Sequence, residues 1–122
     1  MRVIRRFARE VAERFQPDRI ILFGSYAYGT PHADSDVDIL VVMHAYSPLS
    51  KAAQISFTID PPFELDIIVR TPNSMAWRLK EGDSFVREIV SQGKVLYEKA
   101  HAGVGKKSRS RLSSRPGAQP RK

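Results

Sequence analysis

The stretch LFGSYAYGTPHADSDVDILVV, residues 22–42, decides the fold of this chain. It joins two apolar runs, residues 20–23 and 37–42, whose length and composition predict buried strands. Three aspartates crowd at the start of the second run: Asp34, Asp36 and Asp38. Like charges clustered at the first residues of a buried strand repel one another and destabilise the folded state. A bound cation would offset this repulsion. This position is therefore the first candidate for a functional site.

Length and composition set the class of protein. A chain of 122 residues, 42% of them hydrophobic, forms one domain with a modest core. It has no cysteine, which excludes disulfides and thiolate metal sites and is typical of a reducing compartment. No apolar run reaches the roughly 20 residues that a membrane span needs. We therefore expect a cytoplasmic protein without membrane contact.

The formal charge of +7 is unevenly distributed. All 13 acidic residues lie between Glu10 and Glu98, whereas residues 100–122 carry seven basic residues and no acidic one. Subtracting these seven from the 20 basic residues leaves 13 against 13, so residues 1–99 are neutral. We expect residues 1–99 to form the folded domain and residues 100–122 to be a disordered basic tail. Such a tail either contacts nucleic acid weakly through phosphates or is simply solvated.

Hydrophobic periodicity and turn residues predict strands that alternate with helices, which indicates an α/β sandwich. The expected helices are 3–15, 25–28, 48–58, 72–81 and 83–92. The expected strands are 19–23, 37–43, 63–69 and 94–97. The run 37–43 is apolar on both faces, so it should be central in its sheet.

The acidic residues of two strands form the candidate site. Asp36 and Asp38 are two positions apart, so their side chains project from the same face. Asp66 is a single charge inside the apolar run FELDIIVR, and it meets the pair if the two strands are neighbours. Three carboxylates suit one or two Mg²⁺ ions, which would stabilise the attacking and leaving oxygens of a phosphoryl or nucleotidyl transfer.

The pair Gly24-Ser25 supplies the complementary feature, an anion site at a strand-to-helix turn. Glycine lets the backbone approach a phosphate closely, and free N–H groups and the Ser25 hydroxyl can donate hydrogen bonds to it. Each element also has an ordinary explanation, because Gly-Ser and Asp are common in turns. Asp38 and Asp66 are harder to explain in that way, since both fall within apolar strands.

With Gly24, Ser25, Asp36 and Asp38 in register, the stretch matches the nucleotidyltransferase signature G-S-x10-D-x-D. Over residues 1–99 the chain resembles the minimal nucleotidyltransferases of the DNA polymerase β-like superfamily. The resemblance implies a small mixed β-sheet with helices packed against it. It also implies that Asp36 and Asp38 bind Mg²⁺, two ions in all, and that Gly24 and Ser25 hold the triphosphate of ATP. Asp66 would bind the catalytic metal and help to activate the attacking hydroxyl.

Two departures from the family pattern affect these expectations. Many relatives carry Arg at the position of Tyr28. Arg70 and Arg78 are possible substitutes for that cation, although each could equally be a surface residue. Tyr28 flanks the phosphate turn, where it either packs or lies near the nucleotide. The chain also lacks the added helical domain with which larger relatives grip an acceptor, so a partner chain would supply it.

The resemblance also suggests the acceptor. Stand-alone domains of this kind are similar to the antitoxin of HEPN–MNT systems, in which AMP moves from ATP onto a tyrosine of the HEPN toxin. Three alternatives stay open: transfer to a small aminoglycoside-like compound, a binding antitoxin without catalysis, and a nucleic-acid-binding module driven by the tail. The intact acidic set argues against the second, and the neutral domain argues against the third.

Overall fold

A computed structural model describes residues 1–32 and 34–100 of the chain. Its helices are α1 (Arg2–Phe15), α2 (Ser25–Tyr28), α3 (Pro48–Thr58), α4 (Pro72–Lys80) and α5 (Ser84–Gln92). Its strands are β1 (Arg19–Phe23), β2 (Val37–Val42), β3 (Leu65–Arg70) and β4 (Lys94–Glu98). Every expected element is confirmed, with shifts of one or two residues at some ends. The expected tail from residue 100 onward lies almost entirely outside the described residues.

The four strands form one mixed sheet in the order β3-β2-β1-β4. Strand β1 runs antiparallel to both β2 and β4, whereas β2 and β3 are parallel. Strand β2 lies inside the sheet and is buried at five of its six positions, which confirms that it is central. The one position of β2 that is not fully buried belongs to Asp38.

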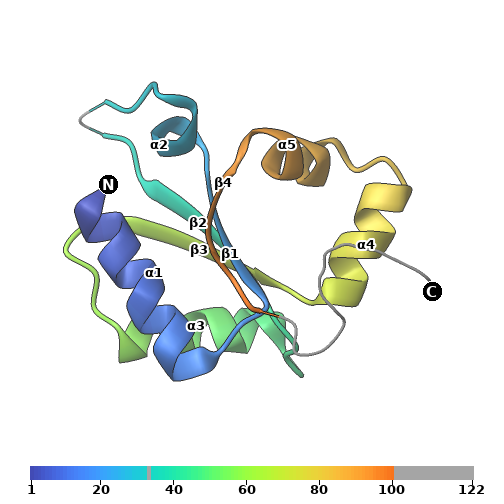
Figure 1. Cartoon of the computed structure of the whole chain (residues 1–122), viewed down its shortest axis with the longest axis horizontal. Coiled ribbons are helices and arrows are strands. Elements are labelled where there is room, and N and C mark those ends of the chain that lie inside the picture. The colour runs from blue at the N-terminus through green and yellow to red at the C-terminus, as the bar shows by residue number, and fades with distance from the viewer. Residues whose placement is uncertain (33, 101–122) are drawn as a thin grey trace.

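Helices cover both faces of the sheet, with α1 and α3 on one side and α4 and α5 on the other (Figure 1). Because side chains alternate along a strand, neighbouring positions of β2 serve different cores. Ile39 pairs with Leu22 in the α1/α3 core, whereas Leu40 pairs with Ile21 in the α4/α5 core. Two cores around one sheet are what the alternating element pattern predicted.

Local sequence signals explain where the helices begin. The side chains of Ser47, Thr71 and Asp83 each accept a hydrogen bond from a backbone N–H in the first turn of the helix that follows. Proline occupies the first turn of α3 and α4, where its missing N–H is no loss. These caps fix the ends of the helices that pack on the sheet.

None of the helices within the described ranges is long and apolar enough to cross a membrane.

Candidate functional site

The pairing of strands brings Asp38 and Asp66 side by side. In the parallel pair of β2 and β3, the two aspartates are direct partners, and on the other side Asp38 is opposite Phe23 of β1. Direct partners project from the same face, so both carboxylates stand on the α4/α5 face, at the end where β2 and β3 begin. Two strands that the chain separates by 22 residues therefore meet at their acidic positions.

Asp36 lies in the loop that leads into β2, two residues before Asp38. It is exposed, as is Asp66, whereas Asp38 is half-buried. Within residues 1–32 and 34–100, no three acidic or histidine side chains already converge as a metal cage. Mg²⁺ does not need such a cage, because it binds through one or two carboxylates and completes its shell with water and phosphate oxygens. The aspartate carboxylates at this end of the strands therefore fit an Mg²⁺ ion that is also bound by a nucleotide.

Gly24 closes the site from the other side. Its backbone has φ 75° and ψ −162°, a combination that is essentially restricted to glycine. A Cβ atom at this position would collide with Oδ2 of Asp38. The turn between β1 and α2 therefore lies directly against the Asp38 carboxylate, and the residue after it, Ser25, begins α2. A phosphate on this turn would lie beside the carboxylates.

Of the three candidate aspartates, Asp38 is the one whose charged form the folded structure disfavours. Burial is the largest factor that raises the pKa of Asp38, and the charges of Asp66 and Asp36 raise it further. The ordinary value for the group is 3.8. The folded environment therefore disfavours the charged form of this carboxyl group. A bound divalent cation would relieve both the desolvation and the repulsion.

This shift predicts a pH-dependent effect on stability. A carboxyl whose pKa is raised by folding binds its proton more tightly in the folded state, so stability declines as pH rises from about 3.8 through the folded pKa. Asp38→Asn removes this penalty. Its melting temperature should exceed that of the wild type at pH 7, and the difference should vanish below about pH 4. Thermal melts of both proteins between pH 3 and pH 7 measure the difference in melting temperature. A difference that persists at pH 3 would contradict the raised pKa of Asp38.

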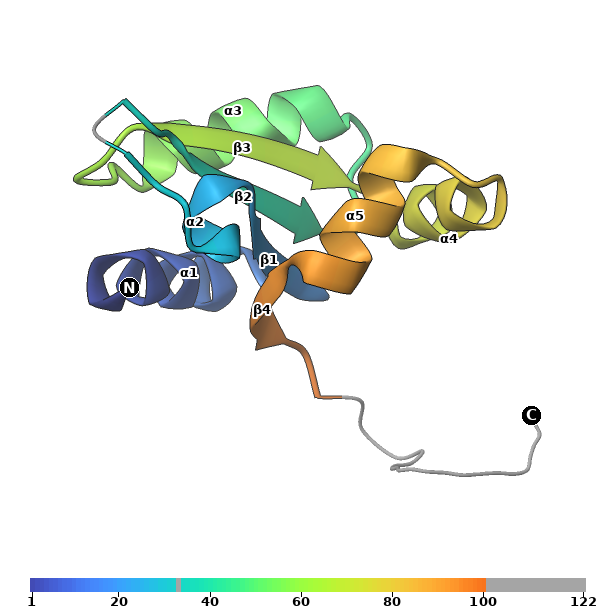
Figure 2. The ribbon, with the colours of Figure 1, turned by 90° about the horizontal axis from the view of Figure 1, so that it is seen from above.

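Sequence reasoning missed Glu88, which contacts Tyr28 beside the phosphate turn. The Tyr28 hydroxyl, at the end of α2, donates a hydrogen bond of 3.1 Å to Oε2 of Glu88 on α5. Burial raises the pKa of Tyr28, as do this hydrogen bond and the charges of Glu88 and Asp38, while the nearby Gly24 backbone lowers it. Viewed from above, α2 sits over the strand ends, across from α5 (Figure 2). No sequence signal links positions 28 and 88, because a glutamate on an exposed helix position is common.

The two arginines that the sequence offered as substitutes for a cation at position 28 are elsewhere. Arg70 pairs with Val42, four residues further along β3 than Asp66 and thus at the opposite end of the strand. Arg78 contacts Asp83 at 3.1 Å in the turn between α4 and α5. Neither side chain stands at the Gly24 turn, so that part of the expectation is wrong.

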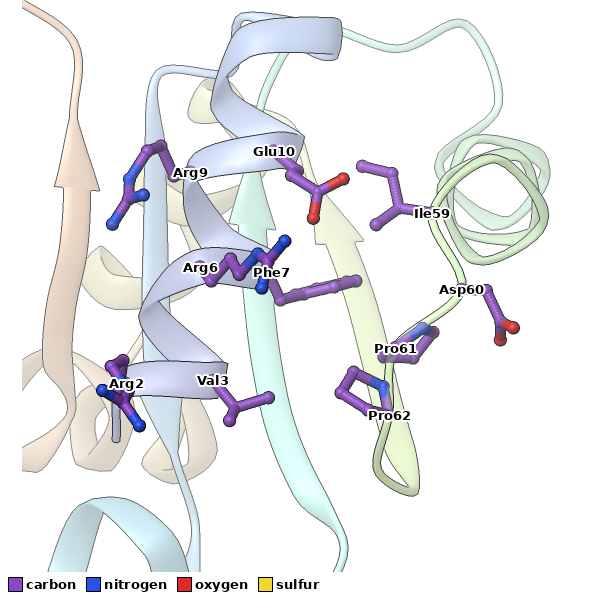
Figure 3. A pocket seen from close by; sticks show the side chains of 10 residues that line it. All are labelled: Arg2, Val3, Arg6, Phe7, Arg9, Glu10, Ile59, Asp60, Pro61 and Pro62. Atoms are coloured by element: carbon purple, nitrogen blue, oxygen red, sulfur yellow. The ribbon is translucent and has the colours of Figure 1, made fainter.

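A separate groove lies on the other face of the sheet (Figure 3). It has a volume of about 810 Å³ and lies between α1 and residues 59–62. Arg6 and Phe7 line one wall, and Pro61 and Pro62 line the other. Phe7 belongs to the α1/α3 core, whereas Asp38 projects from the opposite face. The groove and the carboxylates are therefore different sites.

Comparison with known proteins agrees with this geometry. The family model for the nucleotidyltransferase domain matches residues 4–97. That range contains both the Gly24 turn and all three aspartates. A search of curated protein sequences finds no match to the chain.

Solved structures share the fold. A crystal structure from Sulfolobus solfataricus, described as a candidate nucleotidyltransferase, is 20% identical with a TM-score of 0.56, covering 80% of this chain and 79% of its own. A mutant of the toxin–antitoxin MntA–HpeT is 20% identical with a TM-score of 0.50, covering 78% and 73%. A toxin–antitoxin with AMP-PNP is 24% identical with a TM-score of 0.49, covering 78% and 73%. At these identities the first two likenesses bear on the fold alone.

Proposed function

This chain belongs to the nucleotidyltransferase domain family, and we propose that it is an Mg²⁺-dependent enzyme that transfers AMP from ATP to a hydroxyl group. One observation carries the proposal: Asp38 is the direct strand partner of Asp66, with the Gly24 backbone against its carboxylate. This arrangement puts the carboxylate oxygens and the Gly24 turn together at the end of the sheet where β2 and β3 begin. Ordinary packing does not account for it, because the acidic side chains repel one another.

Each residue has a role in this proposal. Asp36 and Asp38 hold Mg²⁺, and Asp66 holds the catalytic metal, two ions in all. When bound, the metal stabilises charge on the transferring phosphoryl group. Asp66, exposed at the start of β3, orients the incoming hydroxyl and helps to remove its proton. Gly24 lets the triphosphate lie close to the backbone, and the Ser25 hydroxyl donates a hydrogen bond to it.

The acceptor we favour is a tyrosine of a HEPN-type toxin, which would make the chain an antitoxin that acts by adenylylation in the cytoplasm. The support is the signature shared with minimal nucleotidyltransferases and the small size of the domain. In the described residues, no helical domain beyond α1–α5 is available to surround an acceptor. A partner protein that brings both the hydroxyl and its own binding surface fits such an open site.

The test uses α-labelled ATP, Mg²⁺ and a purified HEPN protein. Label on the HEPN protein, lost in EDTA, supports the proposal. Label on an aminoglycoside instead would assign a small-molecule transferase. A stable complex without label would assign a binding antitoxin, and RNA binding without any transfer would assign a nucleic-acid-binding module. The last three outcomes each overturn the proposed acceptor.

Asp66→Ala separates nucleotide binding from chemistry. We expect transfer to fall at least about a hundredfold, because the variant loses the group that orients and deprotonates the hydroxyl. ATP binding should persist through the other two aspartates, as measured by equilibrium binding of a labelled nucleotide with Mg²⁺. Glu64→Ala, which removes an exposed carboxylate two residues away, is the matched control and should keep its activity. Full activity of Asp66→Ala would show that the third carboxylate is misassigned.

A further inference from the structure

Tyr28 follows the phosphate turn closely in the chain, and the proposed function leaves the arrangement of its hydroxyl unexplained. Its backbone N–H donates to the Gly24 carbonyl at 3.0 Å, so α2 is folded tightly over the turn. The hydrogen bond from its hydroxyl to Glu88 brings the phenol toward α5, which covers the same face of the sheet as the Asp38 and Asp66 carboxylates. Since α2 begins directly after Gly24, and Gly24 lies against Asp38, the phenol belongs to the segment that borders the proposed nucleotide site.

Among the tyrosines of the described residues, only Tyr28 donates its hydroxyl to a side chain. Tyr26, Tyr28 and Tyr97 all pack in part against the α1/α3 core, and Tyr46 is fully exposed. The acceptor, Glu88, is an exposed carboxylate that nothing in the packing of α5 requires. A hydroxyl that donates a hydrogen bond to a carboxylate has a possible general base within reach.

We propose that Tyr28 is a self-modification site, at which the enzyme transfers AMP to its own hydroxyl with Glu88 as the base. The inference rests on the proposed function, because it uses the same bound ATP. The Tyr28 Oη attacks the α-phosphorus and forms an O–P bond. The bond from the α-phosphorus to the bridging oxygen breaks, and pyrophosphate leaves. The hydroxyl proton passes to Oε2 of Glu88, 3.1 Å away, and the product is O-adenylyl-tyrosine.

The geometry makes this reaction intramolecular. Tyr28 and Gly24 belong to the same short segment, so the hydroxyl and the proposed phosphate site are within one molecule. The rate per molecule should not depend on protein concentration. The product would cover the Gly24 turn with the attached nucleotide, so each molecule should be labelled once and then bind ATP weakly.

The test incubates the full chain alone with α-labelled ATP and Mg²⁺, followed by intact-mass and peptide mass spectrometry. We expect one AMP per molecule on the peptide that contains Tyr28. Tyr28→Phe should remove the label, whereas Tyr46→Phe and Tyr26→Phe should keep it. Glu88→Gln, which retains an acceptor for the hydrogen bond, should slow labelling about a hundredfold, with the residual rate rising with pH as the phenol ionises unaided.

The outcomes separate the two proposals. Label on a HEPN partner with none on Tyr28 overturns the self-modification and leaves the proposed function intact. Label on neither protein overturns both. Label on another tyrosine, or a rate that rises with protein concentration, overturns the intramolecular site at Tyr28. A Glu88→Gln variant that labels at the wild-type rate removes Glu88 as the base.

Discussion

Replacing Asp38 by Asn is expected to lower AMP transfer by at least about 10⁴-fold, or about 5.4 kcal/mol of transition-state stabilisation. Asn preserves the size of the side chain but removes the charge that the metal requires. Asp38 is the central member of the set, because it pairs with Asp66 and lies against Gly24. Initial rates with α-labelled ATP give the effect, and a thermal melt shows that the variant is folded.

The matched control for this variant is Asp34→Asn. Asp34 is an exposed residue of the loop that leads into β2, and its substitution changes the net charge by the same amount. It should retain activity within about twofold, since a surface charge outside the site contributes little. Unchanged turnover of Asp38→Asn would remove the carboxylate site altogether. An equal loss in both variants would show that the charge of the loop matters, rather than the position of one carboxylate.

Gly24→Ala is expected to have the largest effect on stability. Its φ of 75° and ψ of −162° belong to a region that costs a residue with a side chain about 1–3 kcal/mol. The new Cβ would also collide with Oδ2 of Asp38, so the carboxylate must move. We expect the melting temperature to fall by about 5–20 °C, and transfer to fall about a hundredfold as Asp38 is displaced.

Gly29→Ala provides the comparison for backbone strain without a collision. Gly29 ends α2 with φ 82°, and a Cβ there would meet no atom within 4 Å. Gly29→Ala should lower the free energy of unfolding by about 1–2 kcal/mol and leave the rate of AMP transfer unchanged. Adding Asp38→Ala to Gly24→Ala should recover part of the lost stability, because the collision disappears while the strain remains. A Gly24→Ala variant as stable as the wild type would contradict the close approach.

The strands and helices could be predicted from sequence because each has a strong local signal. The apolar run of β2 is short, rich in Val and Ile and bordered by Asp and Ser, which favours a buried strand. The residues Ser47-Pro48 and Asp83 mark helix starts through their own hydrogen-bonding chemistry. The candidate pair Asp36 and Asp38 also rests on a local signal, because the two residues are two positions apart on one segment, and its role at a metal stays a prediction.

The position of Arg70 could not be predicted from the residues around it. From its place just after the third strand, Arg70 was one candidate for the missing cation, with a surface residue as the alternative. The parallel pairing of β2 with β3 puts the strand starts together and sends Arg70 to the far end, so it is not that cation. Strand direction depends on the connection through α3, which crosses one face of the sheet. No residue near Arg70 carries that information.

Local signals in the sequence predict the elements, the spacing of Gly24 from Asp36 and Asp38, and the neutrality of residues 1–99. The pairing of Asp66 with Asp38 and the contact of Glu88 with Tyr28 arise only in the folded chain. The difference lies in the sequence separation over which each kind of interaction acts. Backbone propensity and side-chain periodicity act over a few residues, whereas contacts between positions 38 and 66, or 28 and 88, exist only after the two cores have packed on the sheet.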